Sequence, residues 1–347
     1  MDLHKILLLM IITRLFLGVV LTLIITCNGY PQRIEVLHSG TGVSLRGLSV
    51  VSQKTIWASG SNGTVGISTN GGKTWRFFVV PGYESRDFRD IEAFDASTAI
   101  LLAVGEPAII LKTTNGGKSW LKVYENKSPG MFLDAMEFWN KKYGFVIGDP
   151  VKARFFVART IDGGSKWQDI PFDKRPLADS GEACFAASGT NVRALDKNQA
   201  CFVSGGSRSR LFWKGAAITL PILQGRETQG ANSVSIWQNG NNAHHIIITG
   251  GDFKADSLRI GNCTLSRDGG KTWIRPFNPP YGYRSCVEFI SATRVITCGI
   301  TGVDLSLDEG INWNNISAIG FHVCRKSKKG DAVFLAGEDG RIGKIIF

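Results

Sequence analysis

A box of eight residues recurs five times along this chain and constrains the fold more than any other feature. The best-formed copy is SRDGGKTW at 266–273, and the other four are STNGGKTW (68–75), TTNGGKSW (113–120), TIDGGSKW (160–167) and SLDEGINW (306–313). Each copy begins with a hydroxyl residue, carries Asp or Asn two positions later, continues with glycine and ends in Trp. A sequence that repeats itself at this scale predicts a repeat architecture.

The spacing of the boxes indicates the kind of repeat. Their Asp or Asn residues stand at positions 70, 115, 162, 268 and 308, with gaps of 45, 47, 106 and 40 residues. The gap of 106 fits two periods of 53, with a decayed box near SRLFWKGAAITLPI (209–222). Short β-rich runs separated by turn residues fill each period, as in LRGLSVV, TIWASG, TVGIST and TWRFFVV of the first repeat. A period of 40 to 50 residues with alternating strands is typical of propeller blades.

We therefore predict an all-β, seven-bladed β-propeller over residues 33–347. The blades are expected to begin near Leu45, Phe88, Phe132, Gly181, Ala231, Tyr283 and Phe321. The last repeat supplies only three strands before the chain stops at Phe347. Its fourth strand is expected from RIEVLHSG (33–40), which would close the ring and leave no open sheet edge.

The boxes themselves are interpreted as scaffolding. The Asp or Asn and the Ser or Thr can accept backbone N–H bonds in a tight turn, glycine takes a positive φ, and the Trp fills apolar space beneath. The predicted structural residues are Asn70, Trp75, Asn115, Trp120, Asp162, Trp167, Asp268, Trp273, Asp308 and Trp313. No metal site is predicted, at these turns or elsewhere in the chain.

The N-terminus is typical of an export signal. Residues 1–27 comprise a short charged start and an apolar stretch whose uninterrupted part, Leu15 to Thr26, is too short to span a bilayer. Cys27 follows a segment that loosely resembles a lipoprotein cleavage box, and an uncleaved anchor is the alternative. The predicted location is outside the cytoplasm: periplasmic, attached to the outer membrane as a lipoprotein, or secreted. A lipid anchor would bring peripheral membrane association.

Net charge and cysteine content narrow the partners. The formal charge of +11 on 347 residues suggests an acidic partner, such as an anionic peptide, glycan or membrane surface, although solubility alone would also explain it. The basic residues are spread out, and nothing resembles a nucleic-acid module. Cys286 with Cys298, or Cys184 with Cys201, could face each other across a hairpin. Without a CxxC or Cys/His spacing, the cysteines are interpreted as small buried apolar residues, and no cofactor is predicted.

The boxes at this spacing resemble those of the BNR or Asp-box propellers of the sialidase-like superfamily. The resemblance covers residues 33–347, and the blade count, the terminal closure and the NGGKTW wording are most similar to the photosystem II stability/assembly-factor-like group. That resemblance implies a seven-bladed propeller that binds a protein segment, with an arginine patch at one face. It says little about function, because one fold hosts many functions.

Charged residues stand at the predicted entries of the innermost strands, where a purely structural strand would carry Val or Ile. Together with one loop carboxylate they form the predicted ligand-binding set of a central funnel: Arg46, Arg89, Asp90, Asp134, Glu182, Asp252, Arg284 and His322. Guanidinium groups at such a place could hold a carboxylate or another anion. The alternative is that these charges pair with each other and rigidify the channel.

Enzymatic readings remain alternatives. A sialidase-like hydrolase would use three arginines, which Arg46, Arg89 and Arg284 could provide, with Tyr283 nearby, but the expected Arg-Ile-Pro signature is absent and sialidases have six blades. Asp134 and Glu182 could serve another glycoside hydrolase or a lyase. An oxidoreductase is the least supported, since GTGVSL (40–45) lacks the third glycine of a dinucleotide fingerprint. The favoured function is an exported, monomeric scaffold of assembly-factor type that binds a protein segment or an anionic small molecule or glycan.

Overall fold

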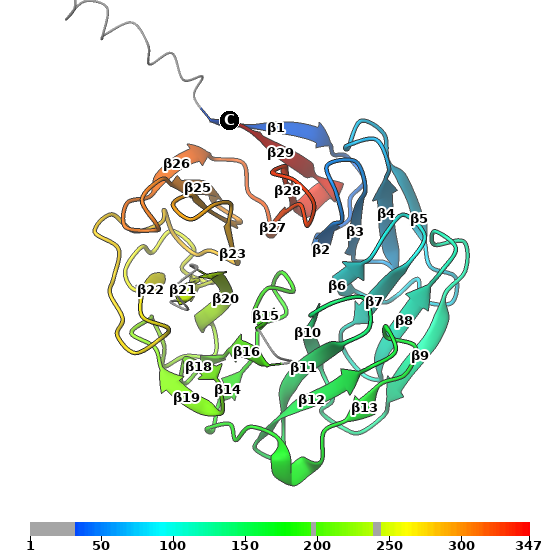
Figure 1. Cartoon of the computed structure of the whole chain (residues 1–347), viewed down its shortest axis with the longest axis horizontal. Coiled ribbons are helices and arrows are strands. Elements are labelled where there is room, and N and C mark those ends of the chain that lie inside the picture. The colour runs from blue at the N-terminus through cyan, green and yellow to red at the C-terminus, as the bar shows by residue number, and fades with distance from the viewer. Residues whose placement is uncertain (1–31, 196–198, 239–243) are drawn as a thin grey trace, which may run out of the picture. The chain divides into compact units, whose positions relative to one another are not determined.

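The computed structural model of the chain describes residues 32–195, 199–238 and 244–347. Residues 34–345 form one compact unit built almost entirely of β-strands. In this unit seven sheets stand around a common centre, as in a seven-bladed β-propeller (Figure 1). The predicted fold class is confirmed. The predicted signal segment 1–27, with Cys27, lies outside the described residues.

The first three blades have four antiparallel strands each, in sequence order from the centre outwards. Blade 1 contains β2 (Leu45–Val50), β3 (Ile56–Gly60), β4 (Thr64–Ser68) and β5 (Arg76–Val79). Blade 2 contains β6 (Phe88–Ala93), β7 (Ala99–Ala103), β8 (Ala108–Thr113) and β9 (Leu121–Asn126). Blade 3 contains β10 (Leu133–Phe138), β11 (Gly144–Val151), β12 (Arg154–Thr160) and β13 (Gln168–Asp169), followed by the 3-10 turn η1 (Phe172–Lys174).

The remaining four blades complete the ring. Blade 4 contains β15 (Val192–Ala194), β16 (Ala200–Val203), β18 (Arg210–Trp213) and β19 (Ala216–Thr219). Blade 5 contains β20 (Gln229–Gln238), β21 (His244–Asp252) and β22 (Cys263–Ser266), extended by β14 (Glu182–Ala183) and β17 (Gly205–Gly206). Blade 6 contains β23 (Cys286–Phe289), β24 (Val295–Gly299), β25 (Gly302–Ser306) and β26 (Asn314–Ser317). Blade 7 contains β27 (Val323–Lys326), β28 (Val333–Ala336) and β29 (Ile342–Ile346), with the 3-10 turn η3 (Glu338–Gly340) before β29.

The N-terminal strand closes the ring. β1 (Arg33–His38) lies beside β29 and completes the sheet of blade 7 in the order β1-β29-β28-β27 (Figure 1). Ile34 and Leu37 of this strand pack against the large apolar cluster between the first and last blades. The predicted closure by residues 33–40 is therefore confirmed. Among the described residues, no helix is long and apolar enough to cross a bilayer.

The start of blade 4 differs from the prediction. Six of the seven innermost strands begin within three residues of their predicted positions, but β15 begins at Val192 and not near Gly181. β15 pairs with β16, and the short strands just outside them in sequence, β14 and β17, pair with each other. Residues 184–191, between β14 and β15, take part in neither pair, and we call them the axial loop. They interrupt the strand that the sequence pattern had placed there.

The five box turns share one hydrogen-bond pattern. Each lies at the end of the third strand of its blade. In each, the first hydroxyl bonds the Asp or Asn side chain and accepts the N–H of the second glycine or its equivalent. The Asp or Asn then accepts the N–H four residues later, at 2.9 to 3.0 Å. Trp313 is fully buried, while the other four box tryptophans are half-buried. The boxes act as turn scaffolds.

Candidate functional site

Bulges occur at the entries of four innermost strands. The register slips at Arg46 in β2, Arg89 in β6, Asp134 in β10 and Asn232 in β20, so that each of these residues has no partner across the ladder. A bulged residue is unpaired and its side chain is re-aimed, which is why bulges recur at functional sites. The equivalent residues are thus Arg46, Arg89, Asp134 and Asn232.

The axial loop occupies the centre of the ring. It departs from blade 4 towards the centre, just before β15 (Figure 1), and all of its residues except Phe185 are buried. Small residues dominate it, as CFAASGTN shows, and a φ of +64° with the Asp90 carboxyl at its back restricts position 189 to glycine. The funnel therefore contains a segment of the chain itself.

Hydrogen bonds connect the axial loop to all six other blades. Arg46 of blade 1 donates to the Ala187 carbonyl at 3.2 Å, and Arg89 of blade 2 donates to the Ala186 carbonyl at 3.5 Å. Asp149 of blade 3 accepts the Cys184 N–H, and Ser233 of blade 5 hydrogen-bonds Thr190. The Ser285 carbonyl of blade 6 accepts the Ser188 hydroxyl, and Arg325 of blade 7 donates to the Gly189 carbonyl. Because the axial loop bonds all six other blades, we expect it to stabilise the ring as well as to line the pocket.

Above this loop lies a pocket of about 550 Å³. One side carries Arg46, Arg89, His322 and Asp149, and residues 183–187 contribute another wall. Four aromatic side chains also line it, namely Phe132, Phe185, Phe253 and Tyr283, and the rest of the lining comes from Asn232, Ser285, Ile300 and Glu338. A largely apolar hollow with a few convergent polar groups is the usual form of a binding site.

The two pocket arginines are close enough to repel each other. Burial lowers the pKa of Arg46, and the charge of Arg89 lowers it further. Arg89 is paired with Asp87, with 2.7 Å between Nε and Oδ2, whereas Arg46 has no carboxylate within salt-bridge distance in the described part of the chain. Arg46 thus presents a positive charge that the described protein neutralises only partly, which favours an anion in the pocket.

Burial shifts the pKa values of His322 and Asp149, which both line the pocket, towards their neutral forms. Burial lowers the pKa of His322 to about 3, and Arg46, Arg89 and Arg341 lower it as well, so the imidazole is neutral at pH 7. Its Nε2 lies 3.1 Å from Ser44 Oγ. Burial raises the pKa of Asp149 to about 6, partly offset by the hydrogen bond from the Cys184 N–H. Protonation of Asp149 at mildly acidic pH would therefore remove one negative charge from the pocket.

Asp90 and Asp134 are buried and do not line the pocket. Burial raises the pKa of Asp90 to about 7, although the carboxyl accepts the N–H groups of Ile91 and Met136. Asp134 is fully buried, and its pKa is raised well above the usual range by burial and by Asp149. The Ala186 amide interacts weakly with Asp134, but no described residue gives its oxygens a hydrogen bond of normal geometry. Asp90 lies against Gly189 and Asp134 lies near the Ala186 amide, so both carboxyls are next to the axial loop and outside the pocket.

The other predicted funnel residues are held by their own neighbours. Glu182 bonds Arg210 through both oxygens and has no exposed side-chain surface. Asp252 accepts Gln229 Nε2 at 3.1 Å and the Lys254 N–H at 2.9 Å within its own hairpin. Neither residue lines the pocket.

Arg284 is fully buried and is also absent from the pocket lining. Its Nε lies 2.7 Å from Asp304 Oδ2, and its Nη1 donates to the Tyr283 carbonyl and to Thr301. Asp304 in turn accepts bonds from Asn315 and from the Tyr281 N–H. Of the eight predicted residues, the structure brings Arg46, Arg89 and His322 together at the pocket.

Sequence reasoning missed the axial loop and the aromatic lining. Two signals were present in the chain. The gap of 106 residues is the longest between boxes, which leaves room for an insertion, and FAASG has poor β-propensity for an innermost strand. The aromatic residues come from loops of four blades, and no spacing rule connects them.

At the opposite end of the innermost strands lies a second hollow of about 490 Å³. Its charges are mutually paired: Arg193 contacts Glu137 and Glu288 at 3.5 and 3.0 Å, and Arg325 contacts both at 3.8 Å. These four residues were not among the predicted funnel residues. Their pairing distinguishes this end from the pocket, where Arg46 has no such partner.

No family model and no curated protein matches the sequence. Among solved structures, the chain is similar to "YCF48 bound to D1 peptide", with a TM-score of 0.63 and 16% identity over 92% of this chain and 96% of that one. It is similar to YCF48 from Cyanidioschyzon merolae, with a TM-score of 0.61 and 16% identity over 90% and 98% of the two chains. The WD40 β-propeller domain of Doa1 gives a TM-score of 0.59 and 12% identity over 90% and 97%. At these identities the likeness shows the fold: this chain is a propeller similar to those of YCF48 and Doa1.

Proposed function

We propose that this propeller binds a protein segment in the pocket above the axial loop, through a carboxylate held by Arg46 and Arg89. A guanidinium fork can hold a carboxylate with two parallel hydrogen bonds. The aromatic lining would receive an apolar side chain next to that carboxylate. The biological role would then be that of an assembly factor or binding scaffold.

The observation that carries this proposal is the incomplete neutralisation of Arg46. It lies next to Arg89 and is largely buried, and among the described residues its side chain hydrogen-bonds only to a backbone carbonyl. A buried charge without a partner is costly, and a bound anion removes that cost. At the other end of the axis Arg193 is already paired with two carboxylates, so a bound anion would remove no such desolvation cost there.

The comparison with solved structures supports the same proposal. One YCF48 structure is that of a complex with a D1 peptide, so a propeller similar to this chain accommodates a protein segment. The natural first probe is therefore that peptide, together with acidic peptides that end in a free carboxylate. Each peptide is paired with its amidated form, which has the same sequence without the terminal charge.

The experiment is a fluorescence-polarisation titration of wild-type protein and of Arg46→Ala. Loss of a charge-assisted hydrogen bond costs roughly 1.5–3 kcal/mol, so the affinity for a carboxylate peptide should fall about tenfold or more. Arg46→Lys should give an intermediate value, since it keeps the charge and loses the fork. Arg159→Ala, an exposed arginine on β12, is the matched control and should bind normally.

The opposite result would be equally informative. Equal affinity for the free-acid and amidated peptides would contradict a carboxylate site. Unchanged binding by Arg46→Ala, with binding lost on mutation of an exposed loop elsewhere, would place the site on another surface. An anionic glycan that competes with the peptide would identify a broader anion site at the same arginines.

The geometry does not favour the sialidase-like alternative. Arg284 is committed to Asp304 and leaves two arginines at the pocket in place of three. Tyr283 donates to Asn232 at 2.8 Å, and burial raises the pKa of its phenol, which disfavours a tyrosinate nucleophile. Glu182, the second carboxylate of the other hydrolase hypothesis, is neutralised by Arg210.

Export is proposed from the sequence alone. Residues 1–26 carry a charged start and an apolar stretch of signal-peptide length, and Cys27 follows them. Fractionation of cells that express the full chain, with mass spectrometry of the mature N-terminus, tests this. A lipid-modified Cys27 would support an anchored lipoprotein, whereas an intact Met1 in the cytoplasm would exclude export.

A further inference from the structure

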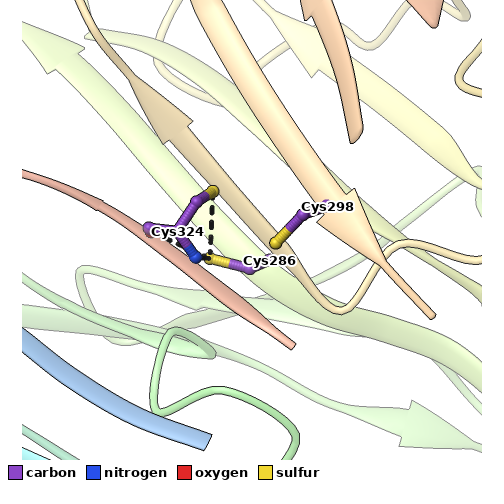
Figure 2. Close-up of side chains that lie close together, drawn as sticks. All are labelled: Cys286, Cys298 and Cys324. Carbon is purple, nitrogen blue, oxygen red and sulfur yellow. Dashed lines mark hydrogen bonds between the residues drawn. The ribbon is translucent and has the colours of Figure 1, made fainter. Parts of the chain in front are cut away.

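Three cysteine thiols meet in the core between blades 6 and 7. Cys286 of β23, Cys298 of β24 and Cys324 of β27 are fully buried, and their sulfur atoms all lie within 4.8 Å of one another (Figure 2). The sulfurs of Cys286 and Cys324 are 3.6 Å apart. Cys286 and Cys298 face each other across the hairpin, as the sequence allowed, and Cys324 arrives from the neighbouring blade.

The separation of the sulfurs suits a shared metal ion. Thiolate sulfur binds Zn²⁺-sized ions at about 2.3 Å, and three ligands at that radius in a plane are about 4.0 Å apart. The separations in the structure, 3.6 Å for one pair and at most 4.8 Å for the set, bracket this value. Small movements of the side chains would bring all three sulfurs into the coordination sphere.

The ligand set indicates which metal. In the described residues the cluster consists of three cysteines alone, with no histidine or carboxylate joining it. Structural zinc sites almost always have four ligands, whereas soft thiolates select Cu(I). We propose that Cys286, Cys298 and Cys324 form a trigonal site for Cu(I). Binding would release to solvent the proton of each thiol that becomes a thiolate ligand.

The test uses the reduced full-length protein and Cu(I) supplied anaerobically as its bicinchoninate complex. Wild-type protein should take up one Cu(I), and X-ray absorption should show three sulfur neighbours. Cys298→Ala and Cys324→Ala should each lower the affinity about a hundredfold or more. Loss of a ligand should exceed the 10- to 100-fold that losing a supporting residue costs.

Cys263→Ala is the matched control, because Cys263 is a buried cysteine on β22 outside the cluster. It should bind Cu(I) as tightly as wild type. Circular dichroism establishes whether each variant is folded, and the sulfur count on wild-type protein does not depend on any variant. A count other than three, or equal affinity of wild type and Cys298→Ala, overturns the proposal. So does a Cys286–Cys324 disulfide that persists in the reduced protein and excludes the ion, since it would occupy two of the three ligands.

Discussion

The five box turns, which we call the rim, and the axial loop with its partners, which we call the axis, satisfy their polar side chains in different ways. At the rim, five box turns repeat the same bonds within eight residues of chain, so each turn is satisfied locally. At the axis, a single loop forms different bonds with six other blades. Local, repeated contacts leave a pattern in the sequence. Contacts made once, between distant residues, do not.

The carboxyl groups of the two regions differ in the same sense. Bonds from its own turn lower the pKa of Asp268 to about 2, because Thr272 donates both its hydroxyl and its backbone N–H to that carboxylate. Burial raises the pKa of Asp149 to about 6 and that of Asp90 to about 7. The rim therefore favours ionised carboxylates, whereas the axis favours neutral ones. This difference can be tested by mutations that affect stability at one place and binding at the other.

The largest effect is expected for Arg284→Ala. It leaves the buried Asp304 without its cation, and breaking a buried ion pair in this way costs about 3–5 kcal/mol. Peptide binding should persist at temperatures where the protein remains folded. The measurement is urea unfolding beside the polarisation titration. A small loss of stability combined with lost binding would show that Arg284 belongs to the site after all.

A smaller loss is expected for Ser188→Ala in the axial loop. Ser188 Oγ donates to the Ser285 carbonyl at 2.7 Å and lies 2.6 Å from Thr190 Oγ1, and all three groups are buried. Leaving a buried partner unsatisfied costs about 1–3 kcal/mol. The free energy of unfolding measures this, with Ser128→Ala, at an exposed serine in the loop after β9, as the matched control. Equal stability of Ser188→Ala and wild type would mean that the loop does not brace the ring.

The sequence predicted the ring well for physical reasons. Glycine, Asp or Asn and Trp at set spacings encode a turn that forms locally, so SRDGGKTW reports its own structure. The period then yields the blade count, and the missing fourth strand of the last repeat yields the closure by β1. The exception is blade 4, where the box has decayed and the axial loop interrupts the strand.

The site was predictable only in part. Arg46, Arg89 and His322 stand at strand entries, and that position brought them together at the pocket. Arg284 is held by an ion pair with Asp304, which lies two strands away in the same blade, and Glu182 is held by an ion pair with Arg210. Neither residue lines the pocket. Bulges at Asp134 and Asn232 change the register of their strands by one residue. Such register changes depend on the ladder partners, and a single strand does not reveal them.

Asp149→Asn tests the difference in protonation between rim and axis. A folded pKa of about 6 against 3.8 unfolded means that the stability contributed by this carboxyl is fully present below pH 4 and is lost as pH rises through 6. Asn keeps the acceptor for the Cys184 N–H and does not titrate. The variant should therefore gain about 1–2 kcal/mol relative to wild type between pH 4 and 7. Unfolding at a series of pH values measures this, with Asp173→Asn on the exposed turn η1 as control. A constant difference across the range would contradict the raised pKa.

The smallest effect is expected at the rim, for Asp268→Ala. The change removes the acceptor of the Thr272 and Lys271 N–H groups and should cost about 1 kcal/mol, by analogy with a lost helix cap. Asp268→Asn should be nearly neutral at pH 7, because Asn70 and Asn115 form the same turn in blades 1 and 2.

The pH dependence separates these two rim variants from those at the axis. The lowered pKa of Asp268 contributes stability that is present above pH 4 and is lost as pH falls towards 2, which is opposite in sign to the contribution of Asp149. Asp268→Asn should remove that acid-dependent part of the unfolding free energy and leave peptide affinity unchanged, because the turn lies away from the pocket. If Asp268→Ala weakened peptide binding in folded protein, the box turns would take part in recognition. That result would contradict the conclusion that the rim contributes stability and the axis contributes binding.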